Sequence, residues 1–154
     1  MIRFVIRHAK ASHDPSIPTD DDRPLTDKGH AQAAFLARAL AEHPAPPARI
    51  ISSPILRAQE TAEHIAEALG LDVETEEALS THSWSGDATD FFLSIDDPLP
   101  VAIVGHNPTF SIIATECARS SISLKTGMCA VLEFQSGPAA ATLRELIRMR
   151  CAKS

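Results

Sequence analysis

Cysteine is scarce in this chain, with three among 154 residues and none in a CxxC pair. Thiols so few and so scattered exclude a disulfide framework. None of Cys117, Cys129 and Cys151 has an arginine six positions downstream, so the sequence also lacks the loop of thiolate phosphatases. We expect all three cysteines to pack in the core.

Metal-binding patterns and long apolar runs are missing as well. The seven histidines form no HExxH or similarly spaced pair, so we expect no metal and no cofactor. No stretch approaches the roughly 20 apolar residues that span a bilayer. The N-terminal MIRFVIRHAK does not have the form of a signal peptide. We therefore expect a cytoplasmic protein that does not associate with membranes.

Positive charge is in short supply, because 14 Lys and Arg face 20 Asp and Glu for a formal net charge of -6. Long-range repulsion then disfavours nucleic acid as a partner. A site for an anionic substrate must be a local basic pocket, and the Asp20-Asp21-Asp22 run is expected to be a solvated loop. The length and the 44% hydrophobic content predict a single domain over residues 1–154. We expect a monomer rather than an oligomer.

The hydrophobic pattern indicates an α/β fold. Short apolar runs at 2–6, 50–51 and 101–104 are each followed by a helical pattern. This alternation predicts a three-layer α/β/α arrangement around a mainly parallel sheet. A flavodoxin-like or dinucleotide-binding domain shares the layers, but no G-x-G-x-x-G follows the first run.

The C-terminal part has a different pattern. Two strand-like segments, 128–134 and 141–147, flank the turn residues Ser136-Gly137-Pro138. We expect an antiparallel hairpin added to the edge of the sheet.

Capping residues set the limits of four expected helices. The first has its N-cap at Thr26 and stops at Pro44, and the second has its N-cap at Ser53, Pro54 at the first helical position and its end at Gly70. The third begins near Asn107-Pro108, and a weaker helical segment covers 87–95. Trp84, Phe91 and Phe92 could line a substrate opening, but buried packing is the commoner fate of such residues.

Basic and imidazole side chains follow three of the expected strands. Arg7-His8 ends the first, Arg57 lies in the first turn of the helix after the second, and His106 follows the third. Alone, each has a plain structural explanation: a basic pair at a strand end, an arginine paired with Glu60, a loop histidine. Because ligands bind beyond the carboxyl ends of parallel strands, we expect the four side chains to converge on one anion-sized space.

Four segments of the sequence carry a resemblance to a known family. They are VIRHAKAS at 5–12, RPLTDKGHAQA at 23–33, SSPILRAQETAE at 52–63 and VGHNPTFS at 104–111. Together, in this order, they resemble the histidine phosphatase superfamily, which has the phosphoglycerate mutase-like fold. The compact length and the RHAKAS form are similar to the short bacterial SixA-like phosphohistidine phosphatases.

The resemblance implies a role for each of the four converging residues. His8 would be the nucleophile that is transiently phosphorylated, while Arg7, Arg57 and His106 would hold the phosphoryl oxygens. The implied substrate is a phosphorylated protein of the histidine-containing phosphotransfer type or a small phosphorylated molecule.

A neutral imidazole is the form that attacks phosphorus, and the reference pKa of about 6.5 leaves histidine mostly neutral at pH 7. The adjacent Arg7 and Arg57 would favour the neutral form of His8 further. One ring nitrogen must face phosphorus while the other donates a hydrogen bond. We expect a protonated His106 to add a third contact, so that protein cations stabilise the transferring group without a metal.

The sequence departs from the family at the acidic proton donor. The family's Leu-x-Glu pattern would fall at Leu79, but the chain reads Leu79-Ser80-Thr81-His82, and Glu77 lies off the pattern. Because imidazole leaves readily once protonated whereas an alkoxide needs an acid, this favours phosphohistidine in a protein as the substrate. Glu77 or His82 would be the possible proton donor if the chain were a phosphatase of small phosphomonoesters. A third possibility is a non-catalytic phosphoprotein-binding domain, which would not need His8.

Overall fold

A six-stranded mixed sheet forms the centre of the computed structural model, which describes residues 1–135 and 140–150. The strand order is β3-β2-β4-β1-β5-β6. The strands are β1 (Ile2–Arg7), β2 (Arg49–Ser52), β3 (Val73–Thr75), β4 (Val101–Gly105), β5 (Cys129–Phe134) and β6 (Ala141–Ile147). The α-helices are α1 (Asp27–Ala41), α2 (Leu56–Leu69), α3 (Ser85–Ser94) and α4 (Thr109–Ala118), with 3-10 helices at Asp20–Asp22 and Glu77–Leu79.

The sheet is parallel from β3 to β1 and antiparallel beyond. β1 pairs with β4, β4 with β2 and β2 with β3 in parallel register, whereas β5 pairs antiparallel with both β1 and β6. The predicted mainly parallel sheet with an edge hairpin is confirmed. The expected turn Ser136-Gly137-Pro138 lies outside the described residues.

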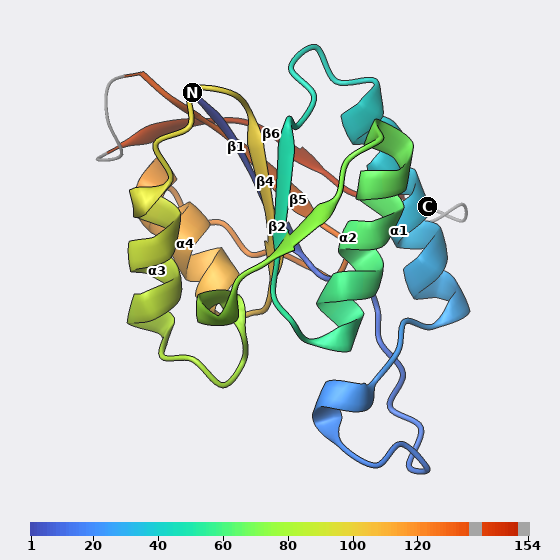
Figure 1. The fold of residues 1–154 in the computed structure, drawn as a ribbon. Coiled ribbons are helices and arrows are strands. Elements are labelled where there is room, and N and C mark those ends of the chain that lie inside the picture. Colours follow the sequence, from blue (N-terminus) through green and yellow to red (C-terminus); the bar gives the residue numbers. More distant parts are fainter. Residues whose placement is uncertain (136–139, 151–154) are drawn as a thin grey trace.

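Two helices cover each face of the sheet, which gives the predicted three layers. Helices α1 and α2 lie on one face and α3 and α4 on the other (Figure 1). Phe4 and Ile6 of β1 belong to the core under α1 and α2, whereas Val5 belongs to the core under α3 and α4. Successive side chains of a strand point to opposite faces, so a strand that is apolar throughout is buried on both.

The caps of α1 and α2 are only partly as predicted. Thr26 Oγ1 accepts a hydrogen bond from the Gly29 backbone N–H at 3.0 Å, and Gly70 ends α2 with a φ of 68°, as expected. The predicted start of α2 at Ser53 is wrong, because the helix begins at Leu56. Ser53 lies before the helix, and its Oγ is 2.8 Å from Nε2 of His106.

The predicted burial of cysteine and aromatic side chains is confirmed for some residues and wrong for one. Cys117 and Cys129 are buried, as predicted, and Cys151 lies outside the described residues. Phe92 is buried, but Trp84 is 72% exposed, so the expectation of buried packing is wrong for it. Trp84 lies just before α3 with its ring against the backbone of Gly86, which leaves most of its surface uncovered. No helix among the described residues is both long and apolar enough to cross a membrane.

Candidate active site

Three parallel strands end at the same level of the sheet and place their following residues together. The register pairs Arg7 with Gly105. The His8 backbone N–H donates to the Gly105 carbonyl, and the Ser53 N–H donates to the Val104 carbonyl, both at 3.0 Å. The residues that leave β1, β2 and β4 therefore emerge at one edge, beyond the carboxyl ends of the strands, where ligands bind in open α/β sheets.

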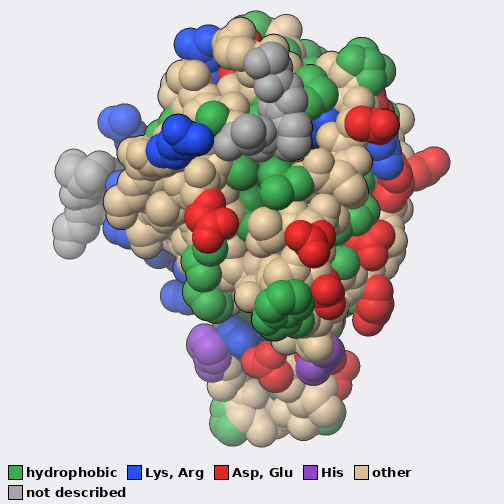
Figure 2. All heavy atoms as spheres, turned by 90° about the vertical axis from the view of Figure 1, so that its left-hand side faces the viewer, with side chains coloured by type: hydrophobic (Ala, Val, Ile, Leu, Met, Phe, Trp, Pro, Cys, Tyr) green, Lys and Arg blue, Asp and Glu red, His purple; other side chains and the backbone are tan. Residues whose placement is uncertain are grey.

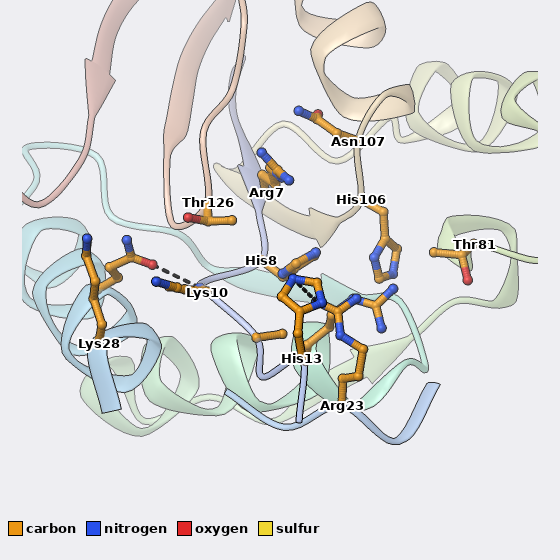
Figure 3. Close-up of a pocket in the computed structure, with 13 residues that line it drawn as sticks. Arg7, His8, Lys10, His13, Arg23, Lys28, Thr81, His106, Asn107 and Thr126 are labelled. Atoms are coloured by element: carbon orange, nitrogen blue, oxygen red, sulfur yellow. Dashed lines mark hydrogen bonds between the residues drawn. The ribbon is translucent and has the colours of Figure 1, made fainter. Parts of the chain in front are cut away.

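A cavity of about 530 Å³ opens at this edge, within the range of about 300–1,000 Å³ typical of small-molecule sites. Arg7, His8, Arg57 and His106, the four residues singled out from the sequence, all line it. The complete lining is Arg7, His8, Lys10, Ala11, His13, Arg23, Lys28, Gln32, Arg57, Thr81, His106, Asn107 and Thr126 (Figure 3).

His8 is held as a neutral imidazole. Its Nδ1 lies 2.7 Å from the Ala9 carbonyl oxygen, which can only accept, so Nδ1 carries the proton and Nε2 keeps its lone pair. Burial, followed by the positive charges of Arg57 and Arg7, lowers the pKa of His8 from 6.5 to about 4. The predicted neutral form is confirmed, with burial rather than the arginines as the main cause.

His106 lies beside His8, with 5.2 Å between the ring centroids. Burial, followed by His8 and Arg57, lowers the pKa of His106 to about 3. The expected protonated His106 is therefore wrong for this structure, because the ring is neutral at pH 7 before any phosphate binds. Its Nε2 contacts Ser53 Oγ at 2.8 Å.

Arg57 is buried, with 4% of its surface exposed, and does not pair with Glu60. Its guanidinium donates to the Asp20 backbone oxygen at 2.8 Å and to the Asp20 carboxylate at 3.1 Å. The Glu60 carboxylate instead accepts from the Leu25 N–H at 2.8 Å. The acidic run at Asp20 is thus a 3-10 helix with a contact in the site, and the expectation of a merely solvated loop is wrong.

Three buried polar atoms of the cavity residues have no hydrogen-bond partner among the described residues: Arg7 Nε, Arg57 Nε and His106 Nδ1. A buried polar group left unpaired costs about 1–3 kcal/mol, so three in one place need an explanation. Among the described residues, no Asp, Glu or Cys lines the cavity, and the donors of Arg7 and Arg57 would repel a cation. The arrangement fits a ligand that brings several acceptor oxygens, such as a phosphoryl group.

Thr61 connects the nucleophile loop to Arg57, a role that no sequence pattern indicated. Its Oγ1 accepts from the Ala9 N–H at 3.0 Å and donates to the Arg57 carbonyl at 2.8 Å. Thr61 follows Arg57 by one helical turn, and only that spacing could have suggested a shared face.

The structure brings neither possible proton donor into the cavity. Glu77 is exposed on its 3-10 helix, and His82 is 67% exposed with Nε2 2.7 Å from the Asp21 carboxylate. Of this segment, Thr81 is the residue that lines the cavity.

The depressed pKa of His8 makes stability depend on pH. In the unfolded chain His8 takes up a proton near pH 6.5, but in the folded protein only near pH 4. Between these values the unfolded state binds more protons, so the free energy of unfolding falls as the pH is lowered through this window. We expect His8→Asn to remove about 2 kcal/mol of the loss between pH 7 and pH 4.5, measured by urea unfolding at both values. Equal losses in both proteins would contradict the burial of a neutral His8.

Comparison with known proteins agrees with this geometry. The model of the histidine phosphatase superfamily (branch 1) matches residues 4–89, more than half of the chain. No curated protein sequence matches the chain significantly.

Several solved structures share the fold at low sequence identity. The protein histidine phosphatase SixA complexed with tungstate is 22% identical, with a TM-score of 0.83 over 96% of this chain and 97% of that one. A phosphoserine phosphatase from Entamoeba histolytica is 16% identical, with a TM-score of 0.74 over 94% and 95% of the two chains. A mycobacterial glucosyl-3-phosphoglycerate phosphatase is 15% identical, with a TM-score of 0.70 over 94% and 95%. The family match and the convergence of the four residues lead to one conclusion: the chain belongs to the histidine phosphatase superfamily.

Proposed function

We propose that this protein removes phosphate from phosphohistidine in another protein, in two steps, through a phosphohistidine on its own His8. The observation that carries the proposal is the neutral imidazole of His8, with Nε2 free, in a cavity where the buried Nε atoms of Arg7 and Arg57 have no partner among the described residues. A binding domain would need the cations but would have no use for this nucleophile, so we favour an enzyme.

In the first step, Nε2 of His8 attacks the phosphorus atom and the bond from phosphorus to the leaving group breaks. The three equatorial oxygens carry the charge as the group transfers. Arg7 and Arg57 hold these oxygens with planar donor forks, and the buried Nδ1 of His106 contributes a donor when it carries the ring proton. The Nδ1–H of His8 continues to donate to the Ala9 carbonyl, which stabilises the positive charge that develops on the ring.

In the second step, water attacks the phosphorus atom of phosphorylated His8, the P–N bond breaks, and inorganic phosphate leaves with the neutral imidazole restored. Arg7 and Arg57 stabilise the same oxygens in both steps. The contact between Arg57 and the Asp20 carboxylate is exchanged for a phosphoryl oxygen when substrate binds, while the Asp20 backbone oxygen remains available to the guanidinium.

The choice of phosphohistidine rests on the leaving group. An imidazole that takes a proton from solvent departs without a protein acid, whereas an alkoxide departs poorly. None of the cavity residues that the structure describes is a carboxylic acid, and Glu77 and His82 lie outside the cavity. The shared fold with a structure named as a protein histidine phosphatase supports this choice.

Small phosphomonoesters are the second candidate substrates. Two structures of the same fold are named as phosphatases of phosphoserine and of glucosyl-3-phosphoglycerate. The pair of His82 with Asp21 is the feature that favours this alternative, because a carboxylate orients an imidazole that could deliver a proton.

A substrate panel tests the proposal. We expect kcat/KM for a phosphohistidine-containing phosphotransfer protein to exceed that for sugar phosphates and phosphoserine at least tenfold, roughly the effect of a missing general acid at the low end. His82→Ala and Glu77→Gln should leave the phosphohistidine rate within about twofold, because neither residue reaches the cavity. Faster turnover of sugar phosphates, lost in His82→Ala, would establish the small-molecule alternative instead.

A further inference from the structure

The cavity holds more positive charge than one phosphoryl group requires. Five of its lining residues, Arg7, Lys10, Arg23, Lys28 and Arg57, are cationic side chains, and no lining residue in the described part of the chain is acidic. A phosphoryl group carries about 1.5 to 2 negative charges at pH 7. The phosphoryl oxygens are matched by Arg7 and Arg57, which leaves the lysines unexplained.

Within the part of the chain that the structure describes, Lys10 and Lys28 have no carboxylate partner. The ion pairs formed within residues 1–135 and 140–150 place Asp20 against Arg23 and Arg57 and include neither lysine. Figure 3 shows both lysines on the side of His8 away from His106 and Thr81. On the face that carries α3 and α4, by contrast, acidic side chains are common, chiefly over the right-hand part of the view (Figure 2).

The two lysines are positioned by the same local structure. The Lys10 N–H donates to Gln32 Oε1 at 2.9 Å, and the Lys10 carbonyl accepts from the Thr26 N–H at 2.9 Å. Gly29 lies so close that an added Cβ would be 2.0 Å from the Lys10 oxygen. The segment two residues after the nucleophile is therefore fixed against the first turn of α1, which carries Lys28.

Folding does not account for the charge at these positions. A cation in the first turn of a helix meets the positive end of the helix dipole and is disfavoured there. Lys28 is the second residue of α1, and both lysines are exposed, so neither contributes apolar packing to the core.

The cavity also has room for more than the transferred group. Its volume of about 530 Å³ would hold on the order of 18 waters at ~30 Å³ each. A phosphoryl group has only four heavy atoms, so a larger part of the substrate fits beside it, at the end where the lysines lie.

We propose that Lys10 and Lys28 form a second anion subsite, which binds a phosphate or carboxylate group of the substrate next to the phosphoryl group transferred to His8. The proposal rests on the proposed role of the His8 cavity in phosphoryl transfer. It assigns the enzyme a substrate with a second negative charge close to the phosphate, either a second phosphate of a small molecule or an acidic side chain beside a phosphohistidine.

Inhibition by two related phosphonates tests the subsite. Methylphosphonate can fill only the phosphoryl position, whereas methylenediphosphonate offers a second group at short distance. With p-nitrophenyl phosphate as the reporter substrate, we expect methylenediphosphonate to inhibit about tenfold more strongly, a preference that weakens at high salt because the lysines are exposed. The measured quantity is the ratio of the two inhibition constants.

Single substitutions assign the preference to the lysines. We expect Lys10→Gln and Lys28→Gln each to lower the ratio at least threefold. Arg38→Gln removes the same charge from the exposed last turn of α1, away from the cavity, and should keep the wild-type ratio. A ratio unchanged in both lysine variants, or lowered equally in Arg38→Gln, would overturn the proposal.

A second arm identifies the source of the anion. Two phosphohistidine peptides that differ only by Glu or Gln beside the phosphohistidine are compared in the wild type and in Lys28→Gln. A preference for Glu that is lost with Lys28 supports an acidic protein substrate, whereas a lysine-dependent ratio for the phosphonates alone supports a small molecule with two phosphates. If neither peptide is hydrolysed, the proposed phosphohistidine substrate is wrong, while the phosphonate ratios still decide the subsite.

Discussion

His8→Ala is expected to lower kcat by about 10⁴-fold or more, since it removes the atom that accepts the phosphoryl group. Alanine leaves the cationic cavity in place, so the variant should still bind an oxyanion while neither releasing phosphate nor carrying it. The measurement uses a phosphohistidine protein with labelled phosphate, quenched on the millisecond-to-second scale and analysed for acid-labile label on the enzyme. Wild-type enzyme should carry the label, and the variant should carry none.

A matched control separates loss of the nucleophile from loss of the fold. His64→Gln replaces a half-buried histidine of α2 that contacts His30 and does not line the cavity. We expect this control to keep the label, and circular dichroism to show the same helix content in both variants. Acid-labile label that persists in His8→Ala would contradict the assignment of the nucleophile.

Arg57→Lys is expected to lower kcat/KM by about 10²- to 10³-fold, the usual cost of removing a donor that stabilises transition-state charge. The buried guanidinium of Arg57 contacts Asp20 and lines the cavity at the same time, and its Nε has no partner within residues 1–135 and 140–150. A lysine keeps the charge but provides a single point of contact, so it cannot replace a planar fork that holds two oxygens.

Binding of an oxyanion gives an independent measure of the same loss. Tungstate, a tetrahedral anion like phosphate, should inhibit wild-type enzyme and bind Arg57→Lys much more weakly. Arg38→Lys, on the exposed end of α1, is the control and should match the wild type in both measurements. Activity of Arg57→Lys within threefold of the wild type would show that the charge alone is sufficient.

The sequence predicted the parts of the site that depend on strand ends. Arg7, His8 and His106 follow apolar runs directly, and parallel strands of one sheet end at a common edge, so their convergence follows from the fold class. Arg57 was found through the start of its helix, even though α2 begins two residues later than Pro54. The N-cap signal was misassigned because Ser53 directs its hydroxyl to His106 instead.

Contacts that depend on tertiary placement could not be predicted. Asp20 reaches Arg57 from 37 positions away, and a run of three acidic residues gives no sign of such a contact. The neutral state of His106 depends on how deeply the ring is buried, which residue identity does not indicate. Trp84 is exposed although large aromatic side chains are usually buried, because burial depends on which elements pack around a residue and not on the residue type alone.

The position of β1 in the sheet separates two tasks of this enzyme. β1 has a strand on each side, so the loop that carries His8 begins from an interior strand of the sheet. The exposed side chains of Lys10, Lys28 and Trp84 contribute nothing to the core, so substitutions there disturb little of the interior. Descendants of this protein can therefore change which molecules they accept by altering the periphery, while the reacting centre stays the same.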